Sequence, residues 1–176
     1  MDGAAARGLL VGLGVAGALL LGGCSGSASQ STPSSTQLDD AFALRLDQTC
    51  TRSVAVTQRW VERHPFPVPG FDRYAPEPDE MPRVAAYYAG DPSVETLADG
   101  IERLGEPSSG AGAWTRFRTD LQRAALLHEQ QVGLLRQGDP TAFVLNVMQS
   151  EQLTQQLESR LVGMGLDATS PCRDAV

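Results

Sequence analysis

Apolar residues recur three, four or seven positions apart along several stretches of the chain, which is the spacing of one face of an α-helix. The first stretch begins at Gln37 and ends at the prolines that start with Pro65, because proline cannot continue a helix. The stripe that it predicts to face a core is Leu38, Phe42, Leu46, Cys50, Val54 and Val61.

Three more stretches have the same period, and a short helix is predicted over 82–89. The first of the three runs to Gly105, the second spans 113–137 and the third spans 139–164. Their stripes are Val94, Leu97, Ile101 and Leu104; then Trp114, Phe117, Leu121, Ala124, His128, Val132 and Leu135; then Phe143, Val147, Leu153, Leu157 and Leu161. No stretch alternates convincingly at period two. The chain is therefore predicted to be all-α, an antiparallel bundle of about four main helices.

The same sequence stands at two predicted junctions between helices, Gly-Asp-Pro followed by Ser93 or Thr141. The glycine closes one helix, and the aspartate, Asp91 or Asp139, is expected to cap the next. The proline then takes the first helical position, where its missing N–H is no loss.

A proline-rich segment, 65–82, holds six of the eleven prolines. It is expected either to lie across the bundle as an ordered arm or to form a mobile loop. Aromatic residues gather around it, and they either attach the arm to the bundle or stay exposed as a partner-binding patch. They are Trp60, Phe66, Phe71, Tyr74, Tyr87 and Tyr88.

Residues 8–23 form an uncharged apolar run of 16 residues that ends in Leu21-Gly22-Gly23-Cys24. A bilayer-spanning helix needs about 20 residues, so the run favours an export signal over a permanent anchor. The segment resembles the lipobox of bacterial lipoproteins, although Gly22 is a less common occupant of its place. The resemblance implies that residues 1–23 are removed and that Cys24 carries lipid on the outer face of the membrane. An uncleaved membrane anchor is the alternative.

Residues 24–36 are rich in Ser and Thr and contain neither charge nor a large apolar side chain, which predicts a flexible spacer. The folded domain is then 37–176. The sequence from Gly12 to Gly17 matches G-x-G-x-x-G, but it lies inside the export segment and so does not indicate a dinucleotide site.

If Cys24 carries lipid, two cysteines remain, and an oxidising compartment favours a disulfide between Cys50 and Cys172. Two separate buried thiols are the alternative. A disulfide requires Cα atoms within about 7 Å, so it predicts that the C-terminal tail returns to the first helix.

The formal net charge is −7, and all 14 cationic residues are arginines without a cluster, which argues against nucleic-acid binding. Neither histidine has metal-ligand spacing, the methionines form no cluster, and no Walker lysine or G-x-S-x-G motif occurs. The acidic run Glu77, Asp79 and Glu80 is expected to be solvated. No enzyme activity, metal or cofactor is therefore expected.

His128 is the most informative polar residue, because it falls on an apolar stripe. It is expected to be either a core histidine with one hydrogen-bond partner, or a pocket residue with Glu129 or Glu95 in reach. His64 is expected to end the first helix, where a cation favours the helix dipole.

The sequence is compatible with two alternative functions. The first is a non-enzymatic interaction or structural module at the cell envelope, anchored by lipid, with a possible protein partner. The second is a small-ligand or metal-binding module with a pocket near His128. The mature chain resembles small two-cysteine lipoproteins of high-G+C Gram-positive bacteria, a resemblance that implies location and no activity.

Overall fold

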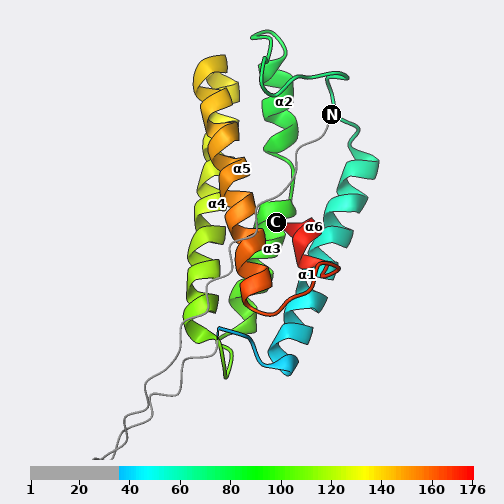
Figure 1. Cartoon of the computed structure of the whole chain (residues 1–176). Coiled ribbons are helices and arrows are strands. Elements are labelled where there is room, and N and C mark those ends of the chain that lie inside the picture. The colour runs from blue at the N-terminus through cyan, green and yellow to red at the C-terminus, as the bar shows by residue number, and fades with distance from the viewer. Residues whose placement is uncertain (1–35) are drawn as a thin grey trace, which may run out of the picture. The chain divides into compact units, whose positions relative to one another are not determined.

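The structure, a computed structural model, describes residues 36–176 and is all-helical in that range (Figure 1). The export segment, Cys24 and most of the spacer lie outside the described residues. The helices are α1 (Asp40–Arg63), α2 (Met81–Tyr88), α3 (Ser93–Leu104), α4 (Ala111–Gln137), α5 (Pro140–Gly163) and the short α6 (Cys172–Ala175). The predicted all-α antiparallel bundle is confirmed. No helix among residues 36–176 is both long and apolar enough to cross a bilayer.

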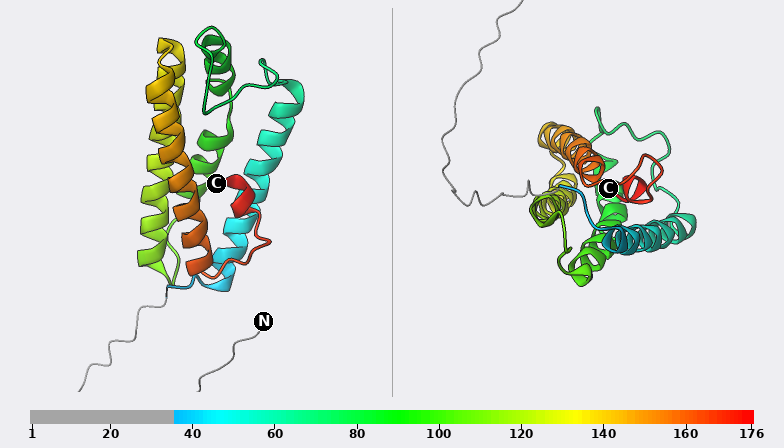
Figure 2. Two further views of the ribbon diagram at one scale, coloured as in Figure 1. Left: turned by 45° about the horizontal axis from the view of Figure 1, so that its top comes forward. Right: turned by 60° about the horizontal axis from the view of Figure 1, so that its bottom comes forward.

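The helices form three columns that run along the bundle. The long helices α4 and α5 lie antiparallel and side by side, while α1 stands on the other side with α6 packed against it (Figures 1 and 2). Between them α2 and α3 follow one another, α2 against α4 and α3 against both α1 and α4. We call the end where α1 and α4 begin the proximal end, and the end where α4 meets α5 the distal end.

Caps explain where the helices begin. The Asp39 carboxylate accepts the Phe42 N–H at 2.8 Å at the start of α1, and Asp139 accepts the Ala142 N–H at 3.0 Å at the start of α5. Gly138 has a φ of 67°, which closes α4 in the left-handed conformation that glycine adopts at little cost. The predicted closure of one helix by glycine and cap of the next by aspartate are thus confirmed at this junction.

The other junction differs from the prediction. The Asp91 carboxylate accepts the N–H of Ser93, two residues on, at 2.9 Å, and the helix begins at Ser93 with Pro92 as its N-cap. The prediction that Asp91 caps a helix starting at Pro92 was therefore wrong by one residue. The Asp91 carboxylate still satisfies the Ser93 N–H at the start of α3, as the side chain of a capping residue does.

The core has two parts. The proximal part centres on Phe42, Trp114 and Phe117, all fully buried, and the indole N–H of Trp114 donates to the Gly105 carbonyl at 2.9 Å. The distal part joins the arm and α2 to the ends of α4 and α5. Its buried members are Val68, Met81, Val84, Ala85, Leu135, Phe143 and Val147.

Val61 corrects the predicted stripe of α1, because its side chain is 45 % exposed. The buried face instead continues through Ser53, which is 2 % exposed, and at the end of the helix Trp60 packs edge-on against Tyr87 with ring centroids 4.6 Å apart. Trp60 lies one residue before Val61, which is a rotation of 100° about the helix axis. This rotation places the Trp60 side chain, and not that of Val61, against α2.

Cys50 and Cys172 form a disulfide with Cα atoms 4.9 Å apart, which confirms the predicted pair and the return of the C-terminal tail to α1. Both residues are fully buried. Beside them the Ser170 hydroxyl donates to the Asp47 carboxylate at 2.6 Å. The tail is therefore held to α1 by a covalent bond and a hydrogen bond.

The proline-rich arm lies against the distal end of the bundle. Val68 is buried, the Phe71 ring lies 6.2 Å from that of Phe143, and Phe66 packs against Tyr87 at 4.9 Å. These contacts favour the interpretation in which the aromatic residues attach the arm.

Candidate functional site

His128 lies on α4 and is half-buried beside the end of α2. Its Nε2 is 3.2 Å from the Tyr88 carbonyl oxygen, and its ring lies 6.1 Å from the Tyr88 ring. A bond from Nε2–H to this carbonyl orients the ring and leaves Nδ1 as an acceptor. The imidazole is thus fixed in place with one nitrogen without a partner among residues 36–176.

A groove of about 580 Å³ opens beside His128, between α3, α4 and the end of α2. Its α3 wall carries Glu95 and Asp99, four residues apart on one side of the helix, and Asp91 lines the groove from the turn just before the helix. Its α4 wall carries His128, Glu129 and Arg136. The lining residues are Tyr88, Ala89, Asp91, Val94, Glu95, Ala98, Asp99, Ala125, His128, Glu129, Val132 and Arg136.

The groove is acidic, with four carboxylates facing one guanidinium. None of these charged groups forms an ion pair within residues 36–176. Unpaired carboxylates on two facing walls reinforce one another's potential, because low-dielectric walls concentrate the field. The arrangement therefore attracts a cation.

Tyr88 contributes a neutral phenol. Burial raises the pKa of its hydroxyl, the Arg73 charge lowers it by less, and Tyr87 and Asp91 raise it by smaller amounts. At neutral pH the hydroxyl therefore stays protonated and remains a hydrogen-bond donor. The ring adds an aromatic face, a surface that cations favour.

The structure brings together the three residues that the sequence proposed for a pocket, since His128, Glu129 and Glu95 all line this groove. Sequence reasoning missed Asp91, Asp99 and Arg136. The four-residue spacing along each helix was the signal that could have found them. No three His, Cys, Asp or Glu side chains in residues 36–176 lie close enough to hold one metal ion.

The other candidates stay apart from this groove. His64 ends α1 as predicted, stacked on Trp60 with Nδ1 2.8 Å from that residue's carbonyl oxygen. Glu77 and Asp79 are exposed on the arm, and the Cys50–Cys172 disulfide is buried. Each therefore has a local structural role or a solvated position.

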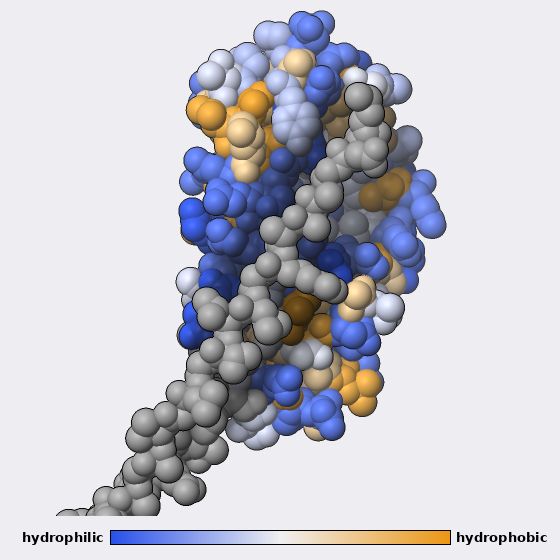
Figure 3. Space-filling view, in the orientation of Figure 1, coloured by the Kyte–Doolittle hydropathy of each residue, from blue (hydrophilic) through white to orange (hydrophobic). Residues whose placement is uncertain are grey.

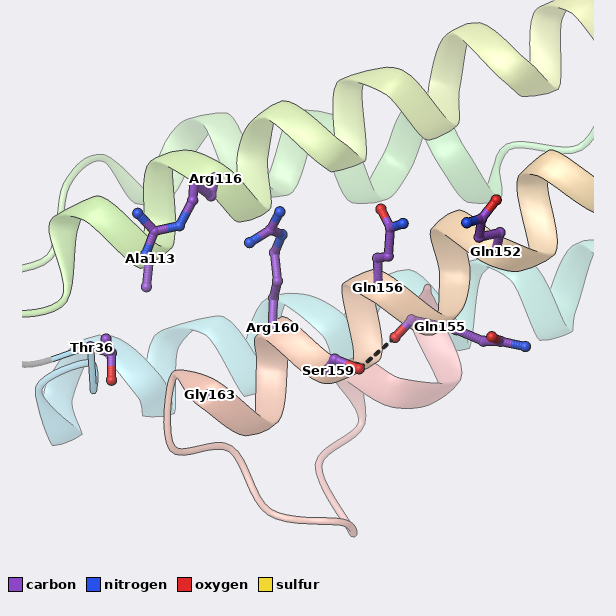
Figure 4. Close-up of a pocket in the computed structure, with 9 residues that line it drawn as sticks. All are labelled: Thr36, Ala113, Arg116, Gln152, Gln155, Gln156, Ser159, Arg160 and Gly163. Carbon is purple, nitrogen blue, oxygen red and sulfur yellow. Dashed lines mark hydrogen bonds between the residues drawn. The ribbon is translucent and has the colours of Figure 1, made fainter.

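A second groove, of about 650 Å³, runs between α4 and α5 at the proximal end (Figure 4). The face of α5 that borders this groove is polar and rich in glutamine. In the structure it forms one wall of the groove, and Thr36 lies at one end. The lining residues are Thr36, Ala113, Arg116, Gln152, Gln155, Gln156, Ser159, Arg160 and Gly163.

No family model, curated protein or solved structure matches this chain.

Proposed function

We propose that the chain is a lipid-anchored, non-enzymatic binding module on the extracytoplasmic face of the cell membrane, and that the His128 groove holds a small organic cation. The observation that carries the proposal is the set of unpaired carboxylates on both walls, Asp91, Glu95 and Asp99 facing Glu129. Because no metal cage forms within residues 36–176, the cation is an amine or a guanidine.

The groove supports an organic cation in a second way. Val94 and Val132 give it an apolar floor between the carboxylates, and Tyr88 offers an aromatic face. A ligand with an apolar stem and a charged head satisfies both kinds of surface, as long cationic side chains do in proteins. A diamine has this chemistry at both of its ends.

The lipid anchor is supported by Leu21-Gly22-Gly23-Cys24 and the short spacer behind it. From residue 24 to residue 36 an extended chain reaches at most about 43 Å, so the domain stays near the membrane surface. The intact mass of the protein from membranes tests this part. The expected mass is that of 24–176 plus acyl chains, with the Cys50–Cys172 disulfide formed.

Calorimetric titration of the mature protein with 1,4-diaminobutane tests the groove. Replacing Glu95 and Asp99 by Gln and Asn is expected to weaken binding at least tenfold, since each charge-assisted hydrogen bond contributes roughly 1.5–3 kcal/mol. Glu62→Gln removes an exposed carboxylate of α1 and is the matched control. If both variants bind the diamine equally well, the groove is not the site.

A second candidate function, a module that docks a protein partner, is supported by exposed apolar side chains at the distal end. Tyr74, Leu145 and Met148 are 50 %, 57 % and 56 % exposed. Figure 3 shows an apolar patch over the distal part of α5. Between Tyr74 and Leu145 the arm and α5 enclose a hollow of about 330 Å³.

Cross-linking in intact membranes tests this second function. Replacing Leu145 and Met148 by Asp is expected to abolish a cross-linked adduct of defined mass. Leu44→Asp alters an equally exposed residue of α1, 60 % exposed, and should leave the adduct intact. Loss of the adduct in both variants, or in neither, argues against docking through the distal end.

A further inference from the structure

The groove between α4 and α5 has a polar wall with a regular spacing. Gln152, Gln156 and Arg160 lie four residues apart, and Figure 4 shows their side chains projecting from α5 toward α4. Arg116 reaches the same groove from α4. The wall from Gln152 to Arg160 is about 12 Å long, given a rise of 1.5 Å per residue.

The charged residues that line this groove are both arginines, whereas the molecule has a net charge of −7. Arg160 uses its Nε to pair with Asp120, and its terminal nitrogens have no partner among the described residues. Arg116 has no ion-pair partner in residues 36–176. The Arg116 guanidinium is thus uncompensated, and the Arg160 guanidinium is held in place by the Asp120 carboxylate.

The remaining side chains are suited to hydroxyl groups. A glutamine carboxamide both donates and accepts, and Gln152 and Gln156 present two such groups in a row. Ser159 donates its hydroxyl proton to the Gln155 carbonyl at 2.8 Å, so its oxygen remains available as an acceptor. Among residues 36–176 no aromatic side chain lines the groove, whereas an extended peptide would need pockets for its alternate side chains.

We propose that this groove binds the phosphate ester of a polyhydroxylated headgroup. The phosphate lies between Arg116 and Arg160, because a guanidinium binds phosphate oxygens through paired N–H donors. The hydroxyl groups lie along Gln156 and Gln152.

The direction of the groove identifies the source of the headgroup as a membrane lipid. The arginine end lies beside Thr36, where the tether enters, and the glutamine end lies farther along the bundle (Figure 4). A membrane lipid presents its phosphate at the surface and its hydroxyl-rich part outward, which is the same order. This step, unlike the binding itself, rests on the proposed lipid anchor.

Calorimetric titration of the full mature protein with inositol 1-phosphate, inositol and inorganic phosphate tests the binding. The expected result is that inositol 1-phosphate binds at least tenfold more tightly than either part alone. Arg116→Gln should lose at least tenfold in affinity, while Arg83→Gln, an exposed arginine of α2, should lose none. Replacing Gln152 and Gln156 by Ala should reduce the preference for inositol 1-phosphate over inorganic phosphate.

The lipid source is tested by competition with detergent micelles that carry phosphatidylinositol or phosphatidylcholine. Only the phosphatidylinositol micelles are expected to displace inositol 1-phosphate. Displacement by neither lipid overturns the lipid source, and equal behaviour of Arg116→Gln and Arg83→Gln overturns the site. The intact mass of the same preparation reports acylation separately, so failure of the anchor is distinguished from failure of the groove.

Discussion

Replacing Cys50 and Cys172 by alanine removes the covalent link between α1 and α6. The link closes a loop across a sequence separation of 122 residues, which takes in α2 to α5. In the chain-entropy model such a loop restricts the unfolded chain by about 16 cal/mol/K, or about 5 kcal/mol at 25 °C. Alanine is chosen because a serine hydroxyl at these fully buried positions would lack a partner.

The expected loss is large compared with the stability of a domain. Folded domains are stable by roughly 5–15 kcal/mol, so the variant should lose a third or more of its free energy of unfolding. Urea unfolding followed by circular dichroism measures this loss. The variant should also show a larger m-value, because its unfolded chain exposes more surface without the cross-link.

Ser170→Ala is the matched control for the tail. It removes the hydrogen bond to Asp47 and keeps the disulfide, so it should cost about 1–3 kcal/mol without changing the m-value. The reasoning is refuted if the double alanine variant loses less free energy than this control. In that case the tail would be held by its non-covalent contacts, and the loop would contribute little.

Three other predictions concern stability. Gly100→Ala should destabilise the fold by about 1–3 kcal/mol, because the added Cβ would lie 2.5 Å from the Thr49 methyl carbon, and Thr49→Ser should restore most of the loss. Gly133→Ala, with no atom within 4 Å, should instead stabilise α4 by about 0.5–1 kcal/mol, and thermal melts of all three variants compare them. The pKa of Asp39 is lowered from 3.8 to about 2, chiefly by the Ser108 hydroxyl and the Phe42 N–H. The ionised Asp39 carboxylate stabilises the fold above pH 3.8, and this stabilisation is lost as the pH falls toward 2. In Asp39→Asn the melting temperature should therefore depend less on pH over that range.

Local patterns predicted the helices well, because caps and apolar spacing act within a few residues. Asp139 caps α5 as expected, since its carboxylate reaches the third residue on. At Asp91 the same Gly-Asp-Pro sequence is followed by a helix that starts one residue later than predicted, at Ser93, whose N–H the carboxylate accepts. Val61 was misplaced because near the end of α1 the contact with α2 is made by Trp60, one residue earlier, and the sequence does not show where α2 packs.

The candidate sites were less predictable, because they depend on which helices meet. The sequence shows carboxylates at 95 and 99 on one side of a helix and a third at 91 just before it, but only the packing of α3 on α4 brings them into one groove with His128. The role of the polar face of α5 depends on packing in the same way. Its glutamines become one wall of a groove only when α4 supplies the other.

Both proposed sites use α4, so their independence is itself a prediction. Arg116 and His128 are 12 residues apart on this helix, which corresponds to about 18 Å. That distance is more than twice the Debye length of about 8 Å at physiological ionic strength, so direct coupling between the two bound charges should be small. Saturating the α4–α5 groove with inositol 1-phosphate should change diaminobutane affinity less than twofold in 150 mM salt.

The same limit must hold in the opposite direction, because coupling between two binding equilibria is reciprocal. Glu95→Gln with Asp99→Asn should therefore leave phosphate-ester affinity unchanged, as Arg116→Gln should leave diamine affinity unchanged. A fivefold effect in both directions would contradict a rigid α4. It would mean that one ligand shifts this helix against α3 or α5, since screened charges at that distance cannot account for an effect of that size.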